Sequence, residues 1–259
     1  MFDLFSVYAA LQIVLESLPI SSSGHLKLMS CWCARHGCAV ELSRTFEYLL
    51  HGPTLIMLAI YCANLWMPLV CNSWRQRFMI GKMLAFVFCA DAIATLVYVV
   101  IQIQLNHLMP LWLGFCLTGL LLLSLRYCEK RHDYRPVTFI KLCMIGVVQG
   151  LAGLPGVSRF ASTYVAGRWL QLAPRKSFFV SIMLQWPLMA GGFLLGILHA
   201  PFDPTIVWFM DGGHILFMTV CATLAYFVLW GVQLMLERER LWLLSPYLVL
   251  PAILAFLWC

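Results

Sequence analysis

The stretch Gln12–His25, with the sequence QIVLESLPISSSGH, interrupts an otherwise apolar N-terminal run. It introduces an acid (Glu16), a proline (Pro19), three serines, a glycine and a histidine. An acid near the centre of a spanning helix costs about 2.5–3.5 kcal/mol on insertion scales, and backbone groups freed by proline and glycine need partners other than lipid. We therefore predict that this segment enters a protein-lined, hydrated cavity and turns back as a re-entrant hairpin.

The composition of the whole chain indicates a polytopic integral membrane protein. Of its 259 residues, 62% are hydrophobic and 11% are charged, whereas a soluble domain carries about 25% charged residues. The net charge of +6 does not indicate a nucleic-acid partner, because the basic residues lie in short loops between apolar segments. Asp3 precedes the first apolar run without a basic region or a cleavage site, so no cleavable signal peptide is expected. We predict one membrane-embedded domain, 1–259.

Two pairs of short apolar segments fall below the ~20 residues that a helix needs to cross a bilayer. Residues 4–18 and 23–33 form the first pair, and 138–153 and 160–172, which flank the sequence LPGVSR (154–159), form the second. Each pair predicts a re-entrant helical hairpin. Six longer segments predict spanning helices in an all-α fold: 48–70, 83–103, 110–126, 177–198, 214–234 and 241–258.

The distribution of basic residues predicts the orientation of these segments. Loops 71–82, 126–136, 168–176 and 235–240 carry Lys and Arg, whereas loops 104–109 and 199–213 carry neither. The positive-inside rule places the basic loops in the cytoplasm and both termini outside, although Lys27, Arg35 and Arg44 on the outer side run against it.

A hairpin followed by three spans occurs twice in opposite orientation. This order predicts an inverted-topology repeat, about 1–126 and 137–259, whose two hairpins meet near the midplane. The sequence repeats weakly in the same places, since Ser22 and Ser158 each stand three residues after a Leu-Pro pair.

The two hairpin turns carry polar side chains suited to phosphoryl chemistry. The candidates are Gln12, Glu16, Ser21, Ser22, Ser23 and His25 in the first hairpin, and Ser158, Arg159, Ser162 and Thr163 in the second. An arginine with hydroxyls at a helix N-terminus favours phosphate, and a carboxylate suits a hard divalent cation that bridges phosphate oxygens. A serine beside a histidine allows nucleophilic attack with a proton acceptor.

Simpler interpretations compete at several positions. Glu16 and Arg159 could form only an intramembrane ion pair, and Gln12 could bridge two helices. His51 and Asp91 lie in apolar spans without an evident partner, and we interpret both as packing residues. Helix packing is also our interpretation of Ser17, Ser30 and Thr118, and interface anchoring that of Trp66, Trp112, Trp208 and Trp242.

Most of the eleven cysteines lie within apolar runs, where we expect buried, unpaired thiols: Cys62, Cys89, Cys116, Cys143 and Cys221. Cys31, Cys33 and Cys38 cluster in one loop with His36. A zinc site or a disulfide within this cluster is less favoured, because Cys-x-Cys-x4-Cys is not a standard zinc spacing. The sequence leaves the pairing of these three cysteines open.

At the hairpin turns the sequence resembles the undecaprenyl-diphosphatase (BacA/UppP) family. Gln12-x3-Glu16 followed by LPISSSGH is similar to that family's (Glu/Gln)-x3-Glu and Pro-x-Ser-Ser-x-Gly-His signature. The segment 153–163, GLPGVSR-x3-T, is similar to its Pro-Gly-x-Ser-Arg-Ser-Gly-x-Thr motif, and the resemblance continues through 46–54, 118–123 and 177–191. The chain departs from the family at Phe160-Ala161, where Ser-Gly is usual, and in a last span without the usual Tyr-Arg.

The resemblance implies removal of the terminal phosphate of undecaprenyl diphosphate, the lipid carrier of cell-wall synthesis, at the outer face of the bacterial inner membrane, and with it bacitracin resistance. It implies catalytic roles for Glu16, Ser22, His25 and Arg159, with Glu16 and Gln12 holding a divalent cation (Mg²⁺ or Ca²⁺). The diphosphate would be bound by Gln12, Ser21, Ser23, Ser158, Ser162 and Thr163. Whether Ser22 or water is the nucleophile stays open, as does a homodimer.

Two other functions share parts of this pattern. Lipid phosphatases of the phosphatidic acid phosphatase type carry Ser-Arg-x5-His, but that histidine would fall at Val165, so their nucleophile is absent. A transporter or flippase for the same lipid phosphate would share the inverted repeat. Because the Ser, His and Glu set exceeds what binding requires, hydrolysis is the preferred prediction.

Overall fold

The computed structural model describes residues 4–38, 43–72, 74–105, 109–128 and 135–259, without the side chains of 64–80 and 102–105. Every regular element in these described ranges is helical, which confirms the predicted all-α class. Within the same ranges, five helical segments are long and apolar enough to cross a membrane: Arg44–Ala63, Gly81–Ile101, Pro174–Phe202, Gly212–Glu237 and Leu241–Trp258. The chain is therefore a multi-pass membrane protein.

These segments match five of the six predicted spans. They fall on helices α4 (His51–Asn72), α5 (Trp74–Leu105), α9 (Pro174–His199), α11 (Gly212–Glu237) and α12 (Val249–Trp258). The sixth prediction, 110–126, falls on α6 (Leu111–Ser124) and the 3-10 turn η1 (Leu125–Tyr127), which together belong with the shorter apolar helices. The remaining short elements are η2 (Ala200–Phe202), α10 (Ile206–Met210), η3 (Leu241–Leu244) and η4 (Pro246–Leu248).

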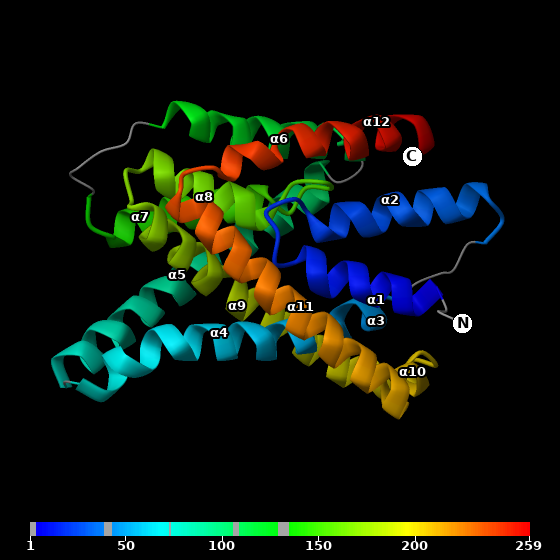
Figure 1. Ribbon diagram of the computed structural model, residues 1–259, viewed down its shortest axis with the longest axis horizontal. Helices are drawn as coiled ribbons and strands as arrows, with labels where there is room; N and C mark the ends of the chain where they lie inside the picture. The colour runs from blue at the N-terminus through cyan, green and yellow to red at the C-terminus, as the bar shows by residue number, and fades with distance from the viewer. Residues whose placement is uncertain (1–3, 39–42, 73, 106–108, 129–134) are drawn as a thin grey trace.

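The predicted hairpin segments form two pairs of short helices. The first pair is α1 (Leu4–Leu15) with α2 (Ser22–Arg35), and the second is α7 (Phe139–Leu151) with α8 (Arg159–Trp169). The turns of the two pairs lie together near the middle of the molecule, and the N- and C-termini lie at one common end (Figure 1).

Glycines allow the two turns to touch. A Cβ atom added to Gly24 would lie 3.0 Å from the Cα atom of Gly156, which itself has φ +78°. A Cβ atom on Gly114 of α6 would lie 1.9 Å from the Pro155 carbonyl oxygen. Thr118, also on α6, accepts a hydrogen bond from the Ser158 N–H at 3.0 Å and so fastens the second turn, in agreement with its predicted packing role.

A proline breaks the helix that leads to the site. Proline lacks an N–H, and its ring clashes with the carbonyl four residues earlier. For Pro53 that residue is Leu49, where α3 (Arg44–Leu49) ends. His51 consequently occupies the first position of α4 rather than the interior of one long helix.

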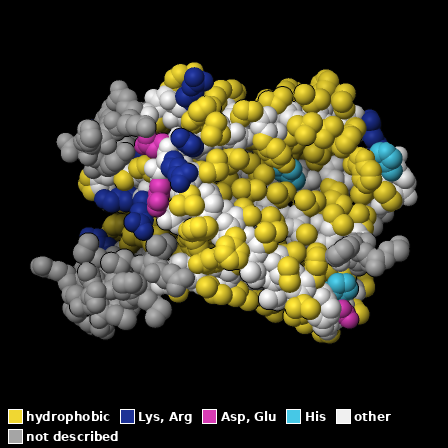
Figure 2. Space-filling model, viewed as in Figure 1, with side chains coloured by type: hydrophobic (Ala, Val, Ile, Leu, Met, Phe, Trp, Pro, Cys, Tyr) yellow, Lys and Arg dark blue, Asp and Glu magenta, His cyan; other side chains and the backbone are white. Residues whose placement is uncertain are grey.

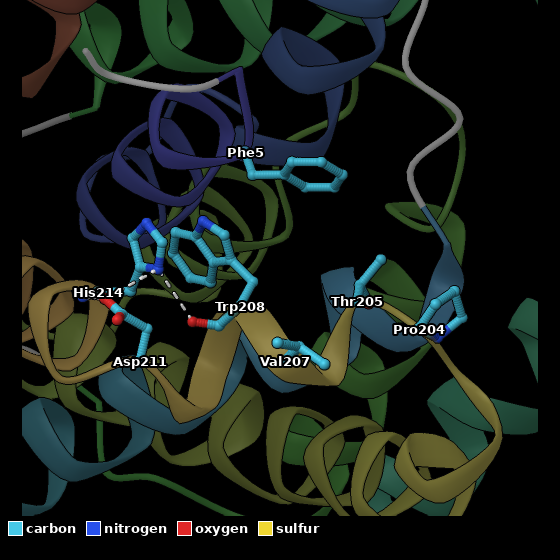
Figure 3. A pocket seen from close by; sticks show the side chains of 7 residues that line it. All are labelled: Phe5, Pro204, Thr205, Val207, Trp208, Asp211 and His214. Carbon is cyan, nitrogen blue, oxygen red and sulfur yellow. Dashed lines mark hydrogen bonds and ion pairs between the residues drawn. The ribbon is translucent and has the colours of Figure 1, made fainter.

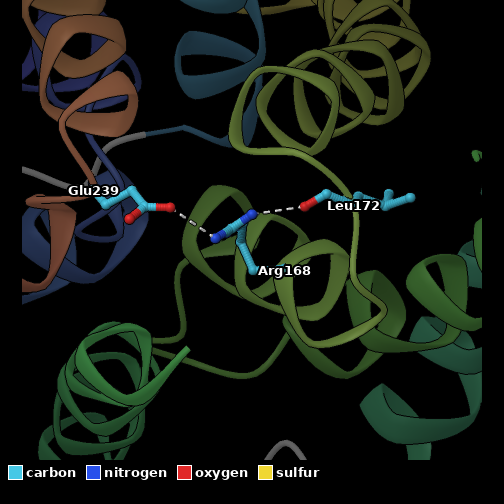
Figure 4. A network of polar contacts seen from close by, with 3 residues as sticks. All are labelled: Arg168, Leu172 and Glu239. Carbon is cyan, nitrogen blue, oxygen red and sulfur yellow. Dashed lines mark hydrogen bonds and ion pairs between the residues drawn. The ribbon is translucent and has the colours of Figure 1, made fainter. Parts of the chain in front are cut away.

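An arginine fastens the second hairpin at its far end (Figure 4). Arg168, in the last turn of α8, donates a hydrogen bond to the Leu172 carbonyl at 2.7 Å and lies 3.2 Å from the Glu239 carboxylate beyond α11. Arg168 is buried within α8, whereas the topology prediction counted it in the loop 168–176.

The cysteine predictions need two corrections. Cys31 forms a disulfide with Cys259 at the end of α12, and not with Cys33 or Cys38. Cys89 is a free thiol as predicted, but it is exposed on the apolar outer surface of α5 rather than buried. Of the other predicted buried thiols, Cys62 and Cys221 are buried, whereas Cys116 and Cys143 are only partly buried.

Candidate active site

Both hairpin turns line one cavity. Glu16 and Ser21–Ser23 come from the first turn, Ser158 and Arg159 come from the second, and Gln185 of α9 completes its polar lining. Apart from Gln185, all of these residues were predicted site residues, and the fold brings them onto one shared surface. Gln185 was missed by the sequence analysis, although it is a polar residue two positions before Pro187 in an apolar span.

Two helices begin at this cavity with a serine cap. The Ser21 hydroxyl accepts a hydrogen bond from the Gly24 N–H, and the Ser158 hydroxyl accepts one from the Ala161 N–H, both at 3.2 Å. The structural counterpart of Ser158 is therefore Ser21 and not Ser22, so the predicted correspondence is one residue out of register. Helix N-termini favour anions, because their first N–H groups have no partner within the helix.

Arg159 presents an uncommitted guanidinium. It is half-buried at the first position of α8 and makes no hydrogen bond or ion pair of 4.0 Å or less with any other described residue. The alternative interpretation, a Glu16–Arg159 ion pair, is therefore not formed as a contact within 4.0 Å, although the two charges line one cavity and are close enough to interact. The five guanidinium donors remain available for an anion in the cavity.

Glu16 pairs instead with His51. The Nδ1 atom of His51 lies 3.2 Å from Oε1 and 3.3 Å from Oε2 of Glu16, and both side chains are largely buried. His51, for which the sequence offers no evident partner, therefore has one in the structure. Only the tertiary fold supplies this pair, since 35 residues separate its members.

His25 is held by two hydrogen bonds in one tautomer. Its Nδ1 atom lies 2.7 Å from the Ser21 carbonyl oxygen, which can only accept, so Nδ1 carries the proton. In the neutral ring, Nε2 is then the acceptor, and the Tyr247 hydroxyl donates to it at 3.1 Å. The two rings stack with a centroid separation of 5.8 Å. Tyr247 was missed, because nothing near it in the sequence points to a residue 222 positions away.

The other predicted site residues lie behind the cavity lining. Thr163 is buried and donates to the Arg159 carbonyl at 2.9 Å, while Ser162 is buried with a hydroxyl that has no partner. Gln12 lies one helical turn before Glu16, and its buried Oε1 atom also lacks a partner. Ser22 lines the cavity, and its hydroxyl makes no hydrogen bond to another described residue.

The residues around Glu16 fit a divalent cation that shares its coordination with a ligand. No group of three His, Cys, Asp or Glu that could hold a metal occurs in the part of the chain that the structure describes. A Mg²⁺ ion, however, is commonly held by one or two carboxylates plus phosphate oxygens and water. Glu16 supplies the carboxylate, and the Gln12 Oε1 and Thr54 Oγ1 atoms are buried without partners.

A larger cavity of about 590 Å³ lies at the end that holds the termini (Figure 3). Phe5 and Trp208 line it, and His214 stacks on Trp208 at a centroid distance of 4.3 Å. Trp208 is only 9% exposed, so its predicted role as an interface anchor is wrong. None of the predicted site residues lines this cavity.

Known proteins of one family match this chain over most of its length. The family model for "Bacitracin resistance protein BacA" matches residues 6–254. Among curated relatives, the undecaprenyl-diphosphatase of Borrelia hermsii is 26% identical over 93% of this chain and 92% of its own. That of Pelobacter propionicus is 33% identical over 74% of each chain, and that of Rhodopirellula baltica is 31% identical over 74% and 72%.

Proposed function

The chain belongs to the bacitracin resistance protein BacA family, and on that premise we propose that it hydrolyses undecaprenyl diphosphate to undecaprenyl phosphate and phosphate. The observation that carries the proposal is the cavity between the hairpin turns. It combines two serine-capped helix N-termini, an uncommitted arginine and a buried carboxylate. These groups suit a phosphoanhydride, which presents several negatively charged oxygens and a bridging oxygen that gains charge as its bond breaks.

We propose that the helix N-termini and Arg159 bind the diphosphate. The N–H groups of the first turns of α2 and α8 face the anion, and the guanidinium can grip two phosphate oxygens through parallel hydrogen bonds. In this proposal Arg159 stabilises the charge that develops on the bridging oxygen, which becomes one of the oxygens of the lipid monophosphate. Gln12, Ser162 and Thr163 support this region from behind the lining.

The nucleophile is either the Ser22 hydroxyl or a water molecule beside it. Its oxygen forms a bond to the terminal phosphorus, and the bond from that phosphorus to the bridging oxygen breaks, so undecaprenyl phosphate leaves with the electron pair. The nucleophile's proton passes to Nε2 of His25, the ring nitrogen that carries no proton, once this nitrogen has exchanged its hydrogen bond with Tyr247 for one with the nucleophile. If Ser22 attacks, water then cleaves the phosphoserine by the same route.

A divalent cation held by Glu16 and Gln12 would neutralise charge on the phosphate oxygens. For the fold we propose re-entrant hairpins that meet near the midplane of an inverted repeat, in a bacterial inner membrane, with the cavity opening to the outer side. The common end of the two termini and the Cys31–Cys259 disulfide support that orientation, because disulfides persist in oxidising compartments.

The test is phosphate release from undecaprenyl diphosphate by purified protein, with Mg²⁺, with Ca²⁺ and with a chelator. We expect metal-dependent release by the wild type and its loss in Glu16→Gln, whereas Gln12→Ala should be milder because an amide is a weaker ligand for a hard cation. The matched control is Glu237→Gln, which changes an exposed acid at the end of α11. If the protein moved the lipid across the membrane without releasing phosphate, its function would be that of a flippase and not a phosphatase.

A further inference from the structure

We propose that His51 is a ligand of the divalent cation at Glu16, and that this mixed nitrogen and oxygen site takes a first-row transition ion such as Mn²⁺ in preference to Ca²⁺. The inference rests on the proposed function, because it specifies the cation of that same site. Its evidence is the geometry of one buried pair and the unpartnered atoms beside it.

The spacing of the pair suits two ligands of one cation. His51 Nδ1 is nearly equidistant from the two Glu16 oxygens, at 3.2 and 3.3 Å. A charge-assisted N–H···O hydrogen bond is usually shorter, about 2.7–2.9 Å. Two ligands that are each about 2.1 Å from one ion and about 90–110° apart are about 3.0–3.4 Å from each other. The imidazole nitrogen and the carboxylate therefore already have the separation that shared coordination requires.

Two further oxygen atoms near this pair lack partners. Thr54 lies one helical turn after His51, and its hydroxyl is close to the Glu16 carboxylate but has no hydrogen bond of good geometry. Gln12 lies one turn before Glu16 on the other element. Both side chains are at least 95% buried, at 1% and 4% exposure. A buried polar atom without a partner is costly, and a bound ion is one of the few groups that would satisfy both atoms.

The ligand chemistry decides the class of cation. Ca²⁺ takes oxygen ligands, whereas an imidazole nitrogen adds affinity for first-row transition ions. A site of one carboxylate, one imidazole, an amide and a hydroxyl should therefore discriminate against Ca²⁺. In the alternative interpretation, His51 only neutralises Glu16, and removal of the imidazole would destabilise the fold without changing which ion binds.

The experiment measures metal binding without any lipid substrate. Mn²⁺ is titrated into purified wild type, His51→Gln and the control His199→Gln, which changes an exposed histidine at the end of α9, and free Mn²⁺ is followed by electron paramagnetic resonance. We expect His51→Gln to weaken Mn²⁺ binding about ten- to a hundredfold and to change Ca²⁺ binding less than about threefold. His199→Gln should match the wild type.

A spectroscopic signature keeps the proposal testable if His51→Gln does not fold. Electron spin-echo modulation of bound Mn²⁺ in the wild type should show a directly coordinated ¹⁴N, which a merely structural His51 would not produce. Absence of that coupling, absence of Mn²⁺ binding, or unchanged Mn²⁺ affinity in folded His51→Gln would overturn the proposal. Failure of the phosphatase function is a separate result, namely no phosphate release by a wild type that binds the ion.

Discussion

At the scale of single residues, the site is built from pairs that the motifs do not reveal. Glu16 and His25 stand in the first motif, but their partners are His51 on α4 and Tyr247 on η4. Arg159 stands in the second motif and has no partner among the described residues. Glu16 and His25 are therefore fixed in position by their partners, while the Arg159 guanidinium stays available for the substrate.

The availability of Arg159 predicts a catalytic rather than a structural loss when it is changed. Arg159→Lys keeps the charge but loses the planar fork that grips two phosphate oxygens. We expect kcat/KM to fall about tenfold to a thousandfold, or about 1.4–4 kcal/mol, and Arg159→Ala to be worse. Turnover assays beside thermal melts in detergent measure both effects.

The melts of these variants should stay near the wild type, because no ion pair is lost. The matched control is Arg35→Lys, which changes an exposed arginine at the end of α2. Near-normal turnover in well-folded Arg159→Ala would remove the arginine from the mechanism.

Tyr247 offers a second prediction at this scale. Tyr247→Phe removes the hydroxyl that donates to His25 Nε2 and keeps the stacked ring. We expect kcat to fall about three- to tenfold, or about 0.7–1.4 kcal/mol, because the acceptor nitrogen is held less well. KM should stay unchanged, since Tyr247 does not line the cavity. Tyr127→Phe, at an exposed position, is the control, and a kcat equal to that control would show that the hydroxyl does not position His25.

The residues that the sequence could predict are those with local signals. Ser21 and Ser158 precede helices and follow Leu-Pro, and Glu16 and Arg159 are charges beside those turns. His51, Tyr247 and Cys259 could not be predicted, because their partners lie 35, 222 and 228 positions away. Composition, spacing and helix periodicity carry no information on such distant contacts.

At the scale of elements, hydropathy and helix-breaking residues predicted most helices to within a few residues. The first hairpin helix ends at Leu15 rather than at residue 18, because Pro19 and the cap at Ser21 leave a turn over 16–21. The predicted span 48–70 is divided at Leu50 by Pro53. The predicted sixth span, 110–126, coincides with the helical segment Leu111–Tyr127, which is shorter than the five segments long enough to cross a membrane. Helix α6 packs against the second hairpin turn, and Gly114 leaves the space for that contact.

The disulfide joins two elements that the sequence analysis left unconnected. It ties the last turns of α2 to the residue that follows α12, and α2 also contacts η4, which directly precedes α12, through His25 and Tyr247. We expect Cys259→Ser to lower stability by about 2–4 kcal/mol, seen as a lower Tm, because the bond limits the unfolded chain. Cys31→Ser should have the same effect.

The double variant distinguishes a disulfide bond from two thiols that contribute to stability independently. Cys31→Ser with Cys259→Ser should be no less stable than either single variant, since one bond is lost in all three. Cys38→Ser changes an exposed free thiol and is the control. Additive losses in the double variant would show that the cysteines do not act as a pair.

At the scale of the whole molecule, the surface is divided into an apolar middle and unlike ends. Apolar side chains spread over the middle of the visible face, and Lys and Arg gather toward the end away from the termini (Figure 2). Leu96, Leu216 and Phe256 are among the large apolar residues that are more than 60% exposed. Exposure of this extent is expected where lipid, rather than water, surrounds the helices.

The last prediction concerns which end faces the cytoplasm. The end that carries η1, the C-terminal turn of α8 and the end of α11 holds Arg126, Arg175 and Arg238, so the positive-inside rule places it inside. The loop 199–213 then lies outside with the termini, and the disulfide at that end agrees with an oxidising compartment. On a background without native cysteines, Phe202→Cys, at a site 87% exposed, should react with an impermeant thiol reagent in intact cells. Tyr127→Cys, at a site 78% exposed near the basic end, should react only after lysis. The reverse pattern would invert the molecule and move the cavity's opening to the cytoplasmic side, where a disulfide would not persist and the lipid diphosphate would have to be drawn from the inner leaflet.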